Sequence, residues 1–265
     1  MLLTPLPDPS DQPNVSRMPP WIRQKLTDQN HAHYALTADA VRTNALHTVC
    51  EEARCPNRGE CWSRGTATFM LLGDVCTRAC GFCAVKTGRP GSYDRDEPRR
   101  IADAVMGMGL DYVVLTSVNR DDLPDGGAQV FADTLSELRR RKPDIGLELL
   151  TPDFQQCQDA AIAMILSASS LPCTSQDAPE RPLVWGHNVE TVPRLYHTVR
   201  KGSKYQRSLQ LLEKVAQQSS ASASQSVVQE GTSDTRGRIP GAPSVETKSS
   251  LMLGLGESQI GRAHV

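Results

Sequence analysis

The chain has 265 residues, with 29 Lys and Arg against 30 Asp and Glu, which gives a formal charge of −1. This length suits one large domain or two small ones. The balanced charge excludes a polyelectrolyte, so we expect neither nucleic acid nor a membrane surface as a partner. The longest wholly apolar run covers seven residues, 160–166, whereas a membrane span needs about 20. With no signal-peptide pattern after Met1, the sequence predicts a cytoplasmic protein.

The N-terminal quarter divides into two segments. Residues 1–18 are rich in Pro, Asp, Ser and Asn, which predicts a flexible arm. Residues 19–66 form an extension that carries three cysteines, with a short helix expected over 37–45. We therefore expect the main folded unit to begin at about residue 67.

Residues 67–257 alternate between two hydrophobic periodicities. Strands are expected at 68–72, 112–118, 145–150, 183–186 and 251–253, and helices at 98–108, 130–141, 159–166, 189–200 and 205–217. Alternation of this kind predicts an α/β fold with parallel strands, in which functional groups follow the carboxyl ends of the strands. A partial or complete (β/α) barrel is the expected architecture.

Two segments depart from this alternation. Residues 217–250 are dominated by Ser, Gln, Gly, Thr and Pro, so we expect a disordered insertion there. Residues 258–265 end in Ile-Gly-Arg-Ala-His-Val, which is also the translation of a common sequencing-adapter string. We therefore expect 258–265 to be a non-native tail.

The cysteines are the most informative residues of the composition. Six of the eight lie within the 34 residues from Cys50 to Cys83, whereas Cys157 and Cys173 stand apart and are expected to be free thiols. In a cytosolic chain of this size, such clustering indicates metal or redox chemistry rather than disulfides. His187 is expected to be a hydrogen-bonded structural histidine, not a metal ligand.

The second cysteine cluster has the spacing Cys-x3-Cys-x2-Cys, at Cys76, Cys80 and Cys83. Three closely spaced thiolates suit three corners of a cubane iron–sulfur cluster, which usually takes four. One iron is then open to a small molecule. A structural zinc site needs a fourth thiolate or imidazole, and no His or Cys occurs between Cys83 and Cys157. A non-catalytic zinc-binding module remains the alternative.

This Cys-x3-Cys-x-aromatic-Cys pattern after a first strand resembles the radical S-adenosylmethionine superfamily. The first cluster, with Cys50, Cys55 and Cys61 spaced Cys-x4-Cys-x5-Cys, narrows the resemblance to the lipoyl synthase family. The likeness continues through the segments 116–127, 150–154, 187–196, 205–209 and 251–257. Biotin synthase is the nearest alternative within the superfamily, but it has no such upstream triad.

The resemblance implies an enzyme that inserts two sulfur atoms at C6 and C8 of a protein-bound octanoyl group. It implies S-adenosylmethionine and two 4Fe-4S clusters, with Cys76, Cys80 and Cys83 holding the radical-generating cluster and Cys50, Cys55 and Cys61 the sulfur-donating auxiliary cluster. The expected partners are an octanoylated lipoyl carrier domain or carrier protein and a one-electron donor such as ferredoxin or flavodoxin. Glu148, Asn188 and Arg207 are candidates for contacts to the polar parts of S-adenosylmethionine.

The family pattern continues beyond the point where this sequence ends. On that basis we expect a partial barrel that lacks its last strand, and an auxiliary cluster without the serine that completes it in the family. An inactive truncated fragment is therefore the second alternative to the enzyme.

Overall fold

The computed structural model describes residues 28–53, 55, 57–64, 66–169, 181–227, 245–252 and 254–256. Its centre is a five-stranded sheet in the order β1-β4-β5-β6-β7, in which every neighbouring pair is parallel. The strands are β1 (Thr68–Leu71), β4 (Tyr112–Ser117), β5 (Gly146–Leu150), β6 (Leu183–Gly186) and β7 (Val245–Lys248). The predicted α/β fold with a parallel sheet is confirmed, and the arrangement is consistent with a partial (β/α) barrel.

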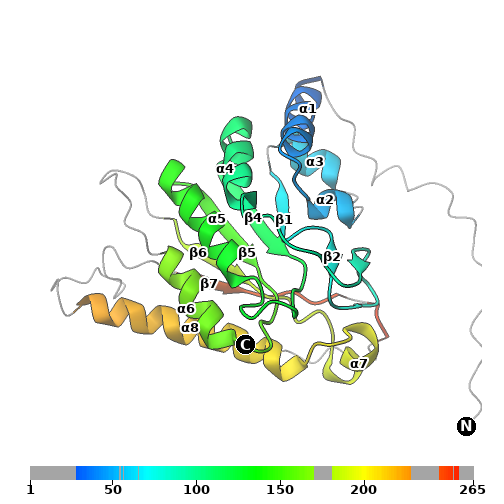
Figure 1. Ribbon diagram of the computed structural model, residues 1–265, viewed down its shortest axis with the longest axis vertical. Helices are drawn as coiled ribbons and strands as arrows, with labels where there is room; N and C mark the ends of the chain where they lie inside the picture. Colours follow the sequence, from blue (N-terminus) through cyan, green and yellow to red (C-terminus); the bar gives the residue numbers. More distant parts are fainter. Residues whose placement is uncertain are drawn as a thin grey trace, which may run out of the picture.

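Helices cover one face of this sheet (Figure 1). They are α4 (Glu97–Met108), α5 (Ala128–Arg141), α6 (Gln158–Ser169) and α8 (Tyr205–Val227). Three helices of the N-terminal extension, α1 (Asp28–Thr43), α2 (Val49–Glu52) and α3 (Arg58–Ser63), gather beside β1. A two-stranded pair, β2 (Val75–Cys76) with β3 (Lys86–Thr87), and the short helix α7 (Tyr196–Val199) lie near the carboxyl ends of the strands.

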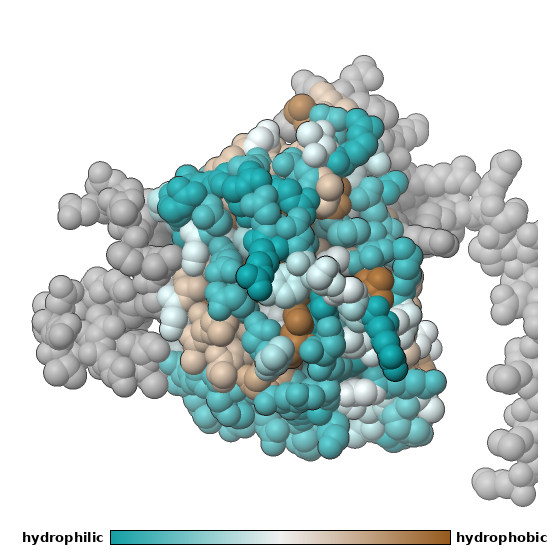
Figure 2. Space-filling view, viewed as in Figure 1, coloured by the Kyte–Doolittle hydropathy of each residue, from teal (hydrophilic) through white to brown (hydrophobic). Residues whose placement is uncertain are grey.

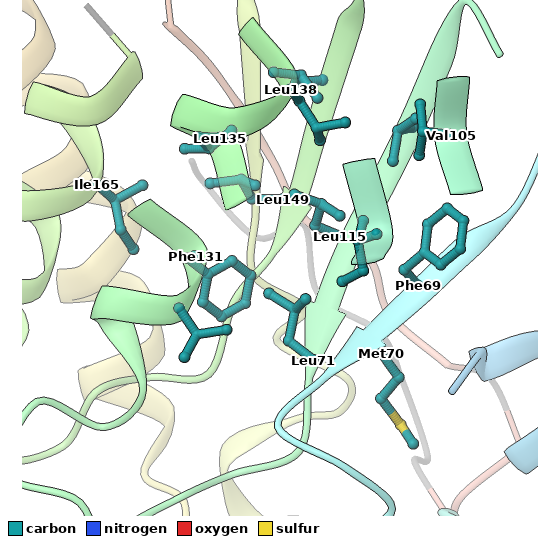
Figure 3. Close-up of a cluster of buried hydrophobic side chains, with 14 of the residues drawn as sticks. Phe69, Met70, Leu71, Val105, Leu115, Phe131, Leu135, Leu138, Leu149 and Ile165 are labelled. Carbon is teal, nitrogen blue, oxygen red and sulfur yellow. The ribbon is translucent and has the colours of Figure 1, made fainter. Parts of the chain in front are cut away.

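The core lies between the sheet and its helices. Alternate strand residues such as Phe69, Leu115 and Leu149 are fully buried in one cluster with Val105 of α4 and with Phe131 and Leu135 of α5 (Figure 3). Burial of each large apolar side chain contributes roughly 1.5–3 kcal/mol relative to leaving it exposed. Because strand side chains alternate between faces, the intervening residues of β1, β4 and β5 point to the opposite face, which is free for a site.

The C-terminal part differs from the sequence prediction in two ways. The fifth strand is Val245–Lys248, not 251–253, where Leu251 forms only an isolated bridge with Glu190. Helix α8 also continues to Val227, so the two flanks of the expected disordered segment 217–250 are regular. Neither was visible in the hydrophobic pattern, because β7 is an edge strand with three of four residues exposed and the end of α8 is Ser- and Ala-rich without Gly or Pro.

Other boundaries also shift. The helix predicted over 189–200 begins only with a 3-10 turn at Pro193–Leu195, followed by α7, since proline favours the first helical turn. The short elements α2, α3, β2 and β3 were not predicted, because each is too short for a periodicity to develop. The expected flexible arm 1–18 and the expected non-native tail 258–265 lie outside the described residues.

The surface seen in Figure 2 is mostly hydrophilic, with apolar residues in small groups. Among the described helices, none combines the length and the apolar character that crossing a bilayer requires. The sheet, the loops at its carboxyl edge and the N-terminal helices position the candidate site.

Candidate functional site

A cavity of about 200 Å³ lies at the carboxyl edge of the sheet, on the face opposite the main helices. Met70, Thr116 and Leu150 form its floor from three neighbouring strands. The second cysteine cluster forms one wall, since all three of its cysteines line the cavity. The structure thus brings Cys76, Cys80 and Cys83 together where the alternation of strands and helices predicted functional groups.

The loop from Cys76 to Cys83 is tied to its surroundings by backbone hydrogen bonds. The Thr77 N–H donates to the Asn119 carbonyl beyond β4 at 3.0 Å, and the Gly81 N–H donates to the Val199 carbonyl at 2.8 Å. Cys80 also forms an antiparallel bridge with Arg200 after α7. Sequence-distant segments therefore hold the cysteines in place.

The surroundings of Cys80 raise the pKa of its thiol overall. Burial raises the pKa of Cys80, and the neighbouring thiolates of Cys76 and Cys83 raise it further, whereas the positive charge of Arg200 lowers it. Because metal ligation requires the thiolate, Arg200 favours the ligating form. A bound cation or cluster is the natural complement of three cysteines in this setting.

The first cysteine triad lies in the N-terminal extension, and its three cysteines are not among the residues that line the cavity. Cys50 lies in α2, whose Val49 and C-terminal neighbour Ala53 line the cavity, and Cys61 lies in α3. Burial raises the pKa of Cys61, and nearby Cys50 and Cys55 raise it further when ionised. The three thiols are therefore close enough to interact electrostatically.

The six cysteines offer thiol ligands in two sets of three. Within the described ranges, no three His, Cys, Asp or Glu side chains form a group that could hold one metal ion. Cysteine thiolates are the usual ligands of iron–sulfur clusters, one at each corner. The chemistry of each set therefore fits such a cluster.

The three polar candidates for cosubstrate contacts lie in different places. Asn188 lines the cavity, and its Oδ1 accepts a hydrogen bond from Ser250 Oγ at 2.7 Å. Glu148 lies deeper in the sheet, where it accepts hydrogen bonds from Tyr112 and Lys248, and it is not part of the lining. Arg207 likewise lies outside the lining and binds Asp153.

Two further lining residues were missed by sequence reasoning, Glu190 and Arg200. The pKa of Glu190 is raised by burial, and the opposing effects of the Arg200 charge and of a hydrogen bond from Asn188 are smaller. The backbone of Glu190 has φ of 67°, a conformation uncommon outside glycine. For Glu190 the available signal was its position after the carboxyl end of β6, because the same rule led to Asn188, whereas Arg200 follows α7 and had no such signal.

A buried network behind this wall fixes Arg200. His187 is fully buried, with Nδ1 2.8 Å from the Thr151 carbonyl and Nε2 2.9 Å from Ser208 Oγ. The carbonyl can only accept, so Nδ1 carries the proton and Nε2 accepts. Arg200 donates to Ser208 and to Tyr196 Oη. The expectation that His187 is structural is confirmed.

Cys157 is a free thiol, as expected, and Cys173 lies outside the described residues.

Comparison with known proteins agrees with this site. The model of the Radical SAM superfamily matches residues 70–235, which include the second cysteine cluster. A lipoyl synthase from Rubrobacter xylanophilus is 47% identical over 239 residues, which are 90% of this chain and 63% of that protein. The chain thus spans less than two thirds of the length of this curated relative. The resemblance stated from the sequence motifs is confirmed at both levels.

Proposed function

The chain belongs to the Radical SAM superfamily, and from that premise we propose that it provides the cysteine-bearing part of a lipoyl synthase, a radical sulfurtransferase. The proposed reaction inserts two sulfur atoms at C6 and C8 of an octanoyl group carried by a lipoyl domain or carrier protein. The observation that carries the proposal is that Cys76, Cys80 and Cys83 line one cavity, which Val49 and Ala53, close to Cys50 in the chain, line as well. The 47% identity to a lipoyl synthase supports it.

We propose that Cys76, Cys80 and Cys83 hold a 4Fe-4S cluster that binds S-adenosylmethionine. When bound, this pair supplies a 5′-deoxyadenosyl radical, which can take hydrogen from an unactivated C–H bond where no side chain can. Asn188 and Glu190 line the same cavity, and we assign them to the polar groups of S-adenosylmethionine. Glu148 and Arg207 already form hydrogen bonds with other residues of the chain. Their contact with the cosubstrate stays a prediction.

The apolar part of the cavity suits an alkyl chain. Met70, Phe82, Val85 and Leu150 line it together with Val49 from α2. Such a lining excludes water and gains free energy by covering methylene groups, about 0.8 kcal/mol for each one buried. We propose that it receives the octanoyl group between the two triads.

We propose that Cys50, Cys55 and Cys61 hold the auxiliary cluster that donates sulfur. A ferredoxin or flavodoxin is the proposed electron donor. The free cysteines of the described residues are compatible with a reducing compartment, and we propose the cytoplasm.

The test is anaerobic reconstitution with iron and sulfide, followed by assay with S-adenosylmethionine, a reductant and an octanoyl-lysine peptide. We expect about eight iron atoms per chain, four for each cluster, and about four after either Cys55→Ala or Cys80→Ala. Cys80→Ala should abolish 5′-deoxyadenosine formation, whereas Cys55→Ala should retain it and lose sulfur insertion.

Cys157→Ala is the matched control, because this thiol belongs to neither triad and should leave iron content unchanged. A wild-type protein that contains zinc and no labile sulfide would refute the proposal. Equal iron loss in all three variants would refute the assignment of separate triads.

A further inference from the structure

Arg78, between the first two cysteines of the second cluster, has a buried side chain that the proposed function does not use. Only 3% of the side chain is exposed. Its Nε and Nη2 donate to the two carboxylate oxygens of Asp121 at 2.8 and 2.7 Å, and Nη2 also donates to Asp153 at 2.6 Å. Nη1 donates to Ser203 Oγ at 3.0 Å. The guanidinium group thus joins the cysteine loop to three other loops.

The charges around Arg78 are balanced. Asp153 is fully buried and also accepts from Arg207 at 2.8 Å, while Asp121 is 23% exposed. Burial raises the pKa of Asp153, but the hydrogen bonds and charges of Arg78 and Arg207 outweigh it and the pKa is lowered. Two arginines therefore face the carboxylates of Asp121 and Asp153. Such a cluster strongly restricts the geometry of its members, since breaking one pair leaves an uncompensated buried charge.

The carboxylates that receive Arg78 lie on the loops after β4 and β5. Thr77 Oγ1 lies 3.0 Å from both an Asp121 carboxylate oxygen and the Asn119 carbonyl, two acceptors for its one hydroxyl hydrogen. The Thr77 N–H also donates to the Asn119 carbonyl. The cysteine loop and the loop after β4 are therefore held in a single register over residues 76–78 and 119–121.

That register places two backbone donors on one sulfur atom. The Asn119 N–H lies 3.3 Å from Cys76 Sγ, and the Arg78 N–H lies 3.4 Å from it. Hydrogen bonds to ligand sulfurs withdraw electron density from an iron–sulfur cluster and are one of the main influences on its reduction potential. Both donors belong to segments that the Arg78 side chain fixes.

We propose that Arg78 is a positioning residue that holds the Asn119 and Arg78 N–H groups on Cys76 Sγ and thereby raises the reduction potential of the cluster bound there. This inference rests on the proposed function, because it requires a cluster on Cys76, Cys80 and Cys83. The bidentate contact with Asp121 is essential to it, and lysine cannot reproduce a planar fork of donors.

The chain offers a matched control in Arg120. Its side chain is 2% exposed and binds Asp122 through Nε and Nη2, with a further bond to the Gly91 carbonyl. It is thus an equally buried arginine paired with an aspartate on the loop after β4. None of these bonds reaches the cysteine loop, so Arg120→Lys reports the cost of altering a buried arginine without loosening Cys76.

The experiment compares Arg78→Lys and Arg120→Lys in a Cys50→Ala, Cys55→Ala and Cys61→Ala background, which leaves a single cluster to observe. The midpoint potential is measured by electron paramagnetic resonance during a potentiometric titration of the anaerobic full-length chain. We expect Arg78→Lys to retain a cluster whose midpoint is shifted to more negative potential, while Arg120→Lys matches the parent. Equal midpoints in the two lysine variants would overturn the inference.

Two further measurements keep the outcome decisive. If Arg78→Lys does not fold, Asp121→Glu displaces the carboxylate of the same bidentate contact while keeping its negative charge, and it should give a negative shift as well. In the reduced, metal-free parent and variants, amide hydrogen exchange at Asn119 should be faster after Arg78→Lys than after Arg120→Lys, and unchanged exchange would count against the clamp. A parent that binds no cluster would instead refute the proposed function.

Discussion

The burial of His187 predicts a specific loss of stability in mild acid. Burial and the positive charge of Arg200 lower the pKa of His187 from 6.5 to about 4, against the opposing effect of the Thr151 carbonyl. The folded chain therefore binds fewer protons than the unfolded chain between pH 6.5 and 4, so stability falls as the pH is lowered through this window. At pH 7.5 both states are largely neutral at this site, and the effect is small.

The magnitude follows from the two pKa values. With 1.36 kcal/mol for each unit of difference, lowering the pH from 7.5 to 5 removes about 2 kcal/mol of the free energy of unfolding through His187 alone. That is a large share of a typical domain stability of about 5–15 kcal/mol. The assay is urea denaturation of the reduced, metal-free chain at several pH values, followed by the fluorescence of the buried Trp185.

His187→Asn separates this effect from other titrating groups. The variant retains a donor for the Thr151 carbonyl but leaves Ser208 without its ring acceptor, at a cost of about 1–3 kcal/mol at pH 7.5. Between pH 7.5 and pH 5, the free energy of unfolding of the variant should therefore decrease by about 2 kcal/mol less than that of the wild type. Identical pH dependence in wild type and His187→Asn would refute the reasoning.

Two paired substitutions extend the test to charge and backbone. Asp153→Asn removes the charge of a fully buried carboxylate from its ion pairs and should lower the free energy of unfolding by about 3–5 kcal/mol. Asp159, beside Lys214, is 72% exposed, so Asp159→Asn should lower it by less than about 1 kcal/mol. Equal losses would contradict the role of burial. Gly127→Ala should be destabilising by at least about 1–2 kcal/mol because φ is 88° and its Cβ would meet Leu72 Cδ1 at 2.3 Å. Gly107→Ala, with open space in α4, should instead stabilise by about 1 kcal/mol, and calorimetry showing the same sign for both would refute the argument.

The elements that the sequence predicted well are those whose residues alternate between a buried and an open face. Strand β4 and helix α5 were found within two residues of their ends, because the buried set of each element repeats at its own period. Strand β7 was missed because its partner β6 supplies backbone hydrogen bonds to a segment with one half-buried and three exposed residues. Backbone hydrogen bonds of this kind leave no signal in the hydrophobic periodicity of the sequence.

The residues of the candidate site were accessible to sequence reasoning only in part. The two cysteine triads were predicted from their spacing, and Asn188 from its place after a strand. Glu190 and Arg200 were missed, since Arg200 reaches the cavity through a bridge to Cys80, 120 positions earlier in the chain. The clamp on Arg78 was equally hidden, because Asp121 and Asp153 lie 43 and 75 positions away.

The sequence by itself determined the kind of chemistry, because ligand identity and spacing are local properties of the chain. It also determined the class of fold, because periodicity reflects which side chains avoid water. Only the tertiary structure decided which charges face one another, which N–H groups reach Cys76 and which polar residues share the cavity with the cysteines. Those contacts join segments that are distant in sequence, and their geometry depends on how the sheet and its loops pack.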